Sequence, residues 1–275
     1  RVEQMFGVRD FAKYRAQAED LCRMEAARDV DLDAIFLRMA TLPGGRDAPL
    51  DRIREFELDH EAAQLLPRRA AVEAVAGQAQ QGKRIVAVSD MYLDAAQLAR
   101  VLPEVVSALP HHWYVSCETG WRKDDGSAWR QLPLAEGVSP HDWMHVGDNE
   151  LADVQRPHDL GMRAMHVLRP SALLDVVPAL RTLRPTTGSS AAWQDQLWLG
   201  LLANRFADIA ARTPEAFSAQ VRIGGPQALG YLVIGPLLMD YLAWTSRLAL
   251  DHDLPRILFL SREGYLLEKA FRILK

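Results

Sequence analysis

The sequence has few cysteines and no excess of basic over acidic residues. Its 275 residues include two cysteines, Cys22 and Cys117, which are too few for a disulfide framework or a cysteine-based zinc site. We therefore expect two buried thiols in a reducing, cytoplasmic environment. The formal net charge of −4 provides no basic surface, so nucleic acid is not an expected partner.

Signals for a membrane span and for several enzyme classes are also missing. No secretory signal opens the chain. The longest uncharged run, residues 223–239, is interrupted by glycines and prolines and closed by Asp240, so we expect a buried helix there and no membrane span. There is no GxSxG elbow of a serine hydrolase and no GxxxxGK[ST] loop for a nucleotide. The chain begins at Arg1 and ends at Lys275 inside an apolar helical pattern, so we expect it to be a fragment of a longer protein.

The hydrophobic pattern changes along the chain and predicts an α/β fold. Apolar residues at helical spacing predict helices over residues 6–82, the last of which Gly82 closes. Four short segments then predict strands, in "RIVAVSD", which is dense in β-branched residues, "HWYVS", "WMHVGD" and "RAMHVL", with helices between them. Strand–helix–strand units at this spacing predict parallel pairing through right-handed crossovers, and therefore a doubly wound parallel sheet.

These patterns divide the chain into five predicted segments. They are a helical segment at 1–82, an α/β core at 83–170, a linker at 171–192, a helical region at 193–250 and the start of a second α/β unit at 251–275. In the last segment, "RILFLSREGYLLEKAFRILK" predicts a strand, a turn and a helix.

Polar side chains follow three of the predicted strands. Ser89 and Asp90 end the first strand, Lys123 follows the second, and Asp148 ends the third, with Asp153 in the next helical turn. Ligands of open parallel sheets bind beyond the carboxyl ends of the strands. A hydroxyl and an ammonium there can hold a phosphate, and two carboxylates can hold Mg²⁺. Because the chain has only five lysines, a lysine at this position is stronger evidence for a site than it would be in a lysine-rich sequence.

Each of these residues also has a purely structural interpretation. Ser89 can simply finish a strand, Lys123 can be a solvated surface charge, and Asp148 can cap a turn or a helix. His145 has no further ligands at zinc spacing, which favours a packing or surface role. The tryptophans near these strands, such as Trp129, are expected in the core or at an interface.

Taken together and in this order, the residues resemble the motifs of the haloacid dehalogenase (HAD) superfamily. "IVAVSD" is similar to its second motif, Lys123 to its third and "GDNELAD" to its fourth. The segments "VSDMYL" and "GDNELADV" resemble those of one branch of the superfamily, which is found among bacterial cell-surface polysaccharide genes. The helical cap of that branch would correspond to residues 6–82. The resemblance implies that Ser89 and Asp90 contact a phosphorylated substrate, Lys123 balances the charge, and Asp148 and Asp153 hold Mg²⁺.

The first motif of that superfamily, a strand ending in DxDxT that carries the nucleophile, is not matched. No apolar run before Ser89 ends in DxD, and "DVDLDAIF" reads as the start of a helix. The resemblance places the missing strand between the strands of Ser89 and Asp148, so both would lose their inner hydrogen-bonding partners. Without a nucleophile, this chain alone is expected to be inactive.

Two functions are consistent with these observations. One is a Mg²⁺-dependent, HAD-type phosphohydrolase of a small phosphorylated metabolite, of which this chain is a part. The resemblance suggests a sugar phosphate of polysaccharide synthesis as the substrate. The alternative is a non-catalytic module that docks a partner such as a glycosyltransferase. In either case, the apolar C-terminal helices predict a protein partner or a homo-oligomer.

Overall fold

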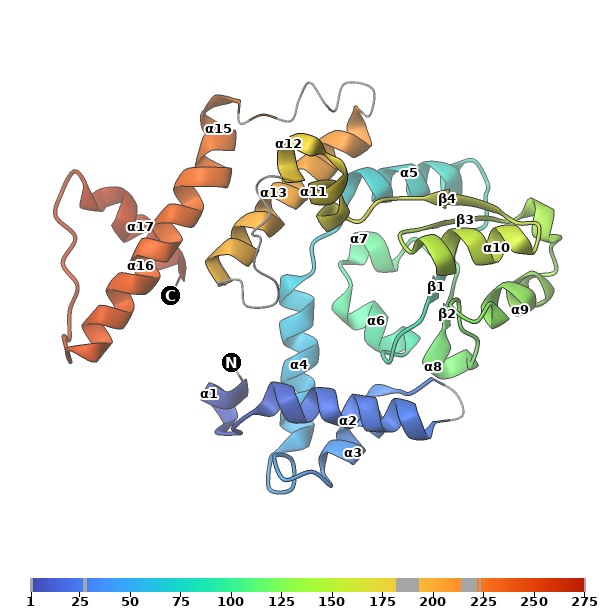
Figure 1. The fold of residues 1–275 in the computed structure, drawn as a ribbon, viewed down its shortest axis with the longest axis horizontal. Coiled ribbons are helices and arrows are strands. Elements are labelled where there is room, and N and C mark those ends of the chain that lie inside the picture. The colour runs from blue at the N-terminus through green and yellow to red at the C-terminus, as the bar shows by residue number, and fades with distance from the viewer. Residues whose placement is uncertain (1, 27–28, 182–192, 214–221, 223, 275) are drawn as a thin grey trace. The chain divides into compact units, whose positions relative to one another are not determined.

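The computed structural model describes residues 2–26, 29–181, 193–213, 222 and 224–274. The chain divides into two compact units, Arg1–Val167 and Leu168–Lys275 (Figure 1). The structure is 64% helical, so helices provide most of the packing surfaces in both units.

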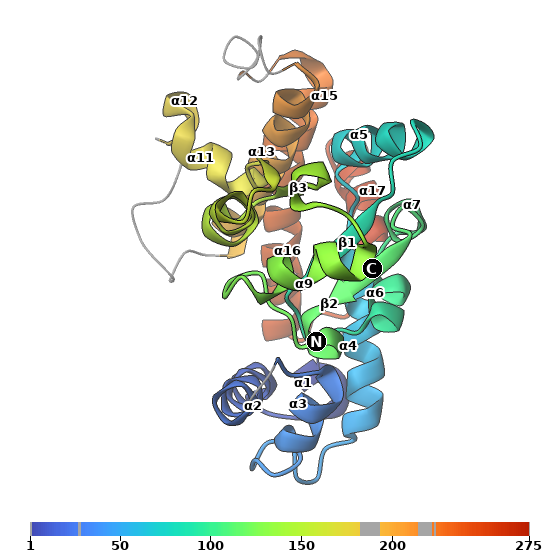
Figure 2. The same ribbon diagram turned by 90° about the vertical axis from the view of Figure 1, so that its right-hand side faces the viewer.

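The first unit begins with helices that pack through one apolar face each. They are α1 (Val2–Phe6), α2 (Phe11–Glu25), α3 (Leu32–Met39), α4 (Leu50–Gln64) and α5 (Arg69–Gln80). Asp31 starts α3 because its side chain accepts the Ala34 N–H at 2.7 Å. The helix start predicted for "DVDLDAIF" is therefore confirmed. Helices α2 and α3 lie side by side in both views (Figures 1 and 2), and Ile35 and Met39 are completely buried on the inner face of α3.

The four predicted strands all form, each four residues long. They are β1 (Val86–Ser89), β2 (His112–Val115), β3 (Met144–Gly147) and β4 (Arg163–His166). The strand β1 pairs with β2 in parallel, with Val86 opposite His112. The strand β3 pairs with β4 in parallel, with Met144 opposite Arg163. Within each pair a helical crossover connects the strands, as the sequence predicts, but no pairing joins one pair to the other.

The predicted doubly wound parallel sheet is therefore wrong. The described residues contain two separate two-stranded sheets, β1–β2 and β3–β4, and no larger one. The separation falls between β1 and β3, the two strands between which the resemblance places a further strand. Backbone groups reach across only one strand spacing of about 4.8 Å, so two strands without an intermediate one cannot share a ladder. The spacing of the crossovers in the sequence predicts that the strands run parallel, but it does not predict which strands are neighbours. The separation into two sheets could therefore not be predicted from it.

Short helices connect the strands and cover them. They are α6 (Ala95–Val101), α7 (Glu104–Ser107), α8 (Ser116–Thr119), α9 (Ser127–Glu136), η1 (Pro140–Asp142), the π-helical turn η2 (Glu150–Gln155) and α10 (Arg156–Asp159). Trp129 on α9 is 1% exposed and packs in one cluster with Trp143 and Met162. The two cysteines are free and buried, as predicted.

All the regular secondary structure in the described residues of the second unit is helical. Its helices are η3 (Pro170–Ala172), α11 (Leu173–Val176), α12 (Pro178–Arg181), α13 (Trp193–Arg212), α15 (Gly225–Leu229), the π-helical η5 (Gly230–Ile234), α16 (Gly235–Asp251) and α17 (Gly264–Leu274). Its core gathers Leu202, Phe206 and Leu232, which are at most 2% exposed. The first part of the predicted linker thus forms short helices, and residues 182–192 lie outside the described residues.

The tail differs from its prediction. Residues 254–260 form no strand, and Leu258 and Leu260 are 85% and 78% exposed. The helix α17 does form after them, as predicted. Within the described residues, one continuous helical stretch, Gly225–Asp251, is long and apolar enough to cross a membrane, judged by length and composition only.

Candidate functional site

Asp90, directly after β1, holds the backbone of the loop that contains Lys123. Its two carboxylate oxygens accept the Lys123 N–H at 3.0 and 2.9 Å. Burial raises the pKa of Asp90 above its ordinary value, while the hydrogen bonds from the Lys123 backbone act in the opposite direction. The end of β1 and the loop after β2 are therefore joined at this residue.

The loop that presents Lys123 is fixed by its own turns. The helix α8 ends at Gly120, whose φ of 73° is one that glycine adopts without strain. The Arg122 N–H then donates to Ser127 Oγ at 2.8 Å, and the Gly126 N–H donates to the Lys123 carbonyl at 3.2 Å. A lysine on such a loop has a defined position, unlike a lysine in a solvated segment.

The Lys123 side chain points to a second strand end, where it meets a buried carboxylate. Its Nζ lies 2.7 Å from Asp153 Oδ1, and the two side chains are 17% and 1% exposed. Asp153 also accepts the Asn149 N–H at 3.0 Å and contacts His145 Nε2 at 3.1 Å. Burial acts to raise the pKa of Asp153, but the hydrogen bonds from His145, Lys123 and Asn149 outweigh it and hold that pKa well below its usual range.

Gly147, the last residue of β3, makes room for this carboxylate. A Cβ at this position would lie 2.4 Å from Asp153 Cγ, closer than non-bonded carbons approach. The Gly-Asp pair at the end of β3 therefore has a steric reason. The glycine admits the Asp153 side chain, and Asp148 follows with an exposed side chain.

Trp129 supports the same region from α9. Its indole N–H donates to the Ala152 carbonyl at 2.8 Å, next to Asp153 in the chain. Its ring centroid lies 4.4 Å from that of His145. The core position predicted for Trp129 is thus confirmed, and His145 has a polar contact in addition to packing.

Sequence reasoning missed His145 as part of this cluster. His145 and Gly147 lie on the same face of β3, because successive side chains of a strand alternate between faces. Once Gly147 is known to contact Asp153, that period of two places His145 beside the same carboxylate. The alternation along β3 is visible in the sequence, but it places His145 in the cluster only when the position of Asp153 is known.

The structure gathers three of the five residues predicted for the site. Lys123 connects Asp90 after β1 with Asp153 after β3. Ser89 immediately precedes Asp90 and is half-buried at the end of β1. Asp148 is exposed, and its backbone carbonyl accepts a hydrogen bond from His166 Nε2 at 3.1 Å. The roles of Ser89 with a phosphate and Asp148 with a metal stay predictions.

The two residues predicted to hold Mg²⁺, Asp148 and Asp153, are not equally suited to bind a metal. No group of three or more His, Cys, Asp or Glu side chains is placed to hold a metal within the described ranges. Both Asp153 oxygens accept hydrogen bonds from the protein itself, which leaves them poorly suited to a metal in this arrangement. Asp148 is the predicted ligand whose side chain is exposed. Asp153 fits the support of Lys123 better than metal ligation.

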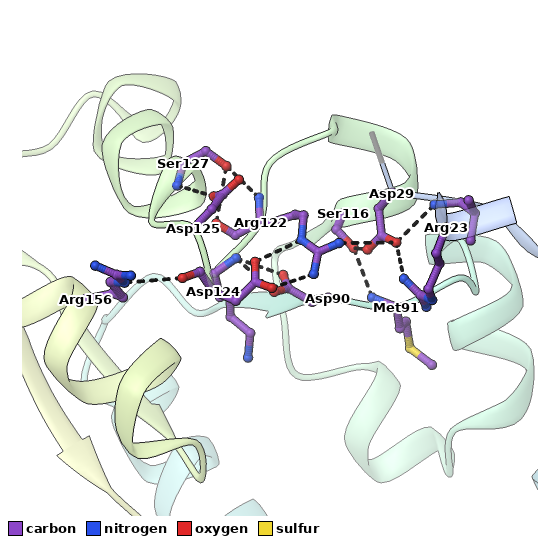
Figure 3. A network of polar contacts seen from close by, with 12 residues as sticks. Arg23, Asp29, Asp90, Met91, Ser116, Arg122, Asp124, Asp125, Ser127 and Arg156 are labelled. Carbon is purple, nitrogen blue, oxygen red and sulfur yellow. Dashed lines mark hydrogen bonds and ion pairs between the residues drawn. The ribbon is translucent and has the colours of Figure 1, made fainter. Parts of the chain in front are cut away.

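A second polar network joins the helical segment to the ends of β1 and β2 (Figure 3). Asp29, whose side chain is 1% exposed, accepts hydrogen bonds from Ser116 Oγ and from Arg23 Nη1, both at 2.5 Å. The same Ser116 hydroxyl accepts the Met91 N–H at 3.0 Å. Arg122, next to Lys123, has its Nη1 at 3.9 Å from Asp29. This carboxylate thus ties the helices before β1 to the loops that form the candidate site.

No protein-family model matches the chain, and no curated protein matches it. The resemblance to the HAD superfamily therefore stays a prediction from the motifs.

Proposed function

We propose that Lys123 is the anion-binding group of a phosphate site, and that the chain is part of a HAD-type phosphohydrolase that acts on a small phosphorylated metabolite. The observation that carries the proposal is the placement of Lys123. Asp90 fixes its backbone and the buried Asp153 fixes its ammonium, at the ends of two different strands. A solvated surface lysine has no need for two carboxylates from separate elements.

The ammonium retains binding capacity after Asp153 is satisfied. Lysine carries three N–H donors, and Asp153 Oδ1 is the acceptor that the structure gives it. The two further donors can bind phosphate oxygens, and the Ser89 hydroxyl can donate to another. Because Asp153 holds the ammonium in one direction, little side-chain entropy is lost when a phosphate binds.

A phosphate here would also meet the negative charge of nearby carboxylates. Mg²⁺ when bound would supply positive charge that offsets this repulsion. Asp148 would hold it together with water and substrate oxygens, the coordination that Mg²⁺ prefers. Asp153 is committed to Lys123 and His145 and so acts as a positioning residue.

Residues 1–275 alone are expected to bind phosphate and not to hydrolyse it. The sequence offers no DxDxT strand before Ser89, and covalent phosphoryl transfer needs such a nucleophile. For the full-length protein, we expect Asp148→Asn to abolish Mg²⁺-dependent phosphatase activity and Lys83→Gln, at an exposed lysine outside the site, to retain it, as measured with p-nitrophenyl phosphate. Equal activity of both variants would contradict the assignment of Asp148.

The binding experiment uses inorganic phosphate as the probe, with and without Mg²⁺. Amide chemical shifts of the wild-type chain are followed during the titration, and the Lys123 amide is expected to move on saturation. Lys123→Gln should weaken binding at least tenfold, because a neutral amide cannot replace a charge-assisted hydrogen bond of about 1.5–3 kcal/mol. Lys83→Gln is the matched control, since Lys83 is exposed and lies outside the site.

Two outcomes would reject the proposal. One is phosphate binding that leaves the Lys123 amide unmoved, which would place the anion elsewhere. The other is equal affinity of the Lys123→Gln and Lys83→Gln variants, which would identify the Lys123–Asp153 pair as structural. That result would favour the alternative function, a non-catalytic module that docks a protein partner.

A further inference from the structure

The helix α16 in the second unit has one packed face and one open face. Leu242 is 1% exposed on the packed face. On the open face, Leu237, Tyr241, Trp244 and Leu248 are 63%, 46%, 58% and 39% exposed. We call these four residues the α16 stripe. Large aromatic side chains at such exposure are unusual on a surface that faces only water.

The spacing of the α16 stripe is that of a helix that packs along another helix. Its members are separated by four, three and four residues, the alternating spacing of the a and d positions in a coiled-coil heptad. A helix with this repeat keeps the stripe facing one partner along its length. The helix has 17 residues and is therefore about 25 Å long.

The charged residues beside the stripe show which partner fits. Asp240 and Arg247 lie seven residues apart, and therefore on the same flank of the stripe. The Asp240 side chain is oriented by a hydrogen bond from Gln194 Nε2 of α13 at 2.8 Å. Arg247 is exposed. One acid and one base on the same flank make the surface complementary to a copy of itself in the opposite direction.

We propose that two copies of this chain pair through the α16 stripe in an antiparallel arrangement. In that alignment Tyr241 faces Trp244 of the second copy, and Leu237 faces Leu248 of the second copy. The same alignment places Asp240 opposite Arg247 of the second copy, and the two-fold symmetry repeats the pair. A parallel arrangement would not bring these two charges together.

The available area indicates a weak dimer. Large side chains bury on the order of 150–250 Å² each when fully covered, and the four members of the stripe are about half exposed, which gives roughly 400 Å² per copy. The pair would bury roughly 800 Å² before flanking residues are added, below the roughly 1,200 Å² of stable specific interfaces and in the range of weak, transient ones. We therefore expect dissociation in the micromolar range.

The experiment measures molar mass by light scattering at about 5–200 μM, with charge reversals as the specific test. Asp240→Arg alone places arginine opposite arginine, and Arg247→Asp alone places aspartate opposite aspartate. Each is expected to weaken the dimer at least tenfold, because like charges now face each other. An equimolar mixture of the two variants is expected to dimerise again, because each copy then complements the other.

Matched controls separate pairing from folding. Gln194→Ala removes the hydrogen bond to Asp240 without a charge change and should leave the dimer in place. Leu250→Asp changes an exposed leucine outside the stripe and should also dimerise, whereas Trp244→Asp should not. Circular dichroism checks that every variant retains its helix content.

Three results would overturn the proposal. They are a wild-type chain that is monomeric at 200 μM, a mixture of the charge variants that does not dimerise, and a monomer that floats with phosphatidylcholine–phosphatidylglycerol vesicles. Flotation with vesicles would show that the stripe binds a lipid surface. A monomer that does not bind vesicles would indicate that another segment of the same chain covers the stripe.

Discussion

Replacement of Gly147 by alanine tests the steric role of this residue in the candidate site. The backbone angles of Gly147 lie outside the left-handed region, so alanine meets no conformational strain there. Its Cβ would, however, lie 2.4 Å from Asp153 Cγ and 2.5 Å from Oδ2. Non-bonded carbons need about 3.5 Å, so one of the two groups must move by roughly 1 Å.

The cost follows from what holds Asp153. Overpacking alone costs about 1–3 kcal/mol, and disturbing a buried, hydrogen-bonded charge adds to it. Since the Lys123 partner is 17% exposed, solvent moderates this second part. We expect Gly147→Ala to lower the free energy of unfolding by about 2–4 kcal/mol in urea titrations, and to weaken phosphate binding at least tenfold.

The same substitution elsewhere in the first unit provides the control. Gly77 lies inside α5, and a methyl group added there would have no neighbouring atom within 4 Å, so Gly77→Ala should stabilise the chain by about 0.5–1 kcal/mol. The two variants should therefore shift the urea midpoint in opposite directions. A Gly147→Ala variant within about 0.5 kcal/mol of wild type would refute the reasoning, because Asp153 would then have room to move.

Three further predictions concern the groups around the site. Asp153 has a depressed pKa, so its stabilising effect is present above the unfolded aspartate pKa of about 3.9 and is lost as the pH falls towards the folded value. Urea midpoints of wild type should therefore fall between about pH 5 and pH 2, and Asp153→Asn should flatten that slope. Trp129→Phe leaves the Ala152 carbonyl without its donor and should cost about 1–3 kcal/mol in the same titration, whereas an unchanged midpoint would show that water replaces the indole. Ser116→Ala removes the hydroxyl that bridges Asp29 to a backbone N–H, and a loss of about 1–3 kcal/mol is expected, with Ser116→Thr as the variant that keeps the oxygen.

The sequence predicted local structure well because local structure has local causes. The four strands were predicted from short segments between helical patterns, the first of them dense in β-branched residues, and the start of α3 from the aspartates before it. The separation into two sheets could not be found in this way, because it depends on which strands become neighbours. The tail shows the same limit, since "RILFLS" has strand-forming residues but no partner strand among the described residues.

The candidate site was predictable to the extent that strand ends converge. Ser89, Asp90, Lys123, Asp148 and Asp153 were all proposed from that rule. The separate roles of these side chains were not predictable, because they depend on contacts between residues far apart in the chain. Asp29 is the clearest case, since its hydrogen-bonding partner Ser116 lies 87 positions away.

The contacts of Asp29 also limit how the first unit can move. The Leu32 N–H donates to the Tyr92 carbonyl at 2.9 Å, and Arg100 on α6 pairs with Glu55 on α4 at 2.7 Å, so the helices are fastened to the strand side at several points. An outward swing of α2 and α3 would break the Leu32–Tyr92 hydrogen bond and would separate Asp29 from the Ser116 hydroxyl. We therefore expect α2 and α3 to stay in place against the loops after β1 and β2, and not to swing as a hinged lid.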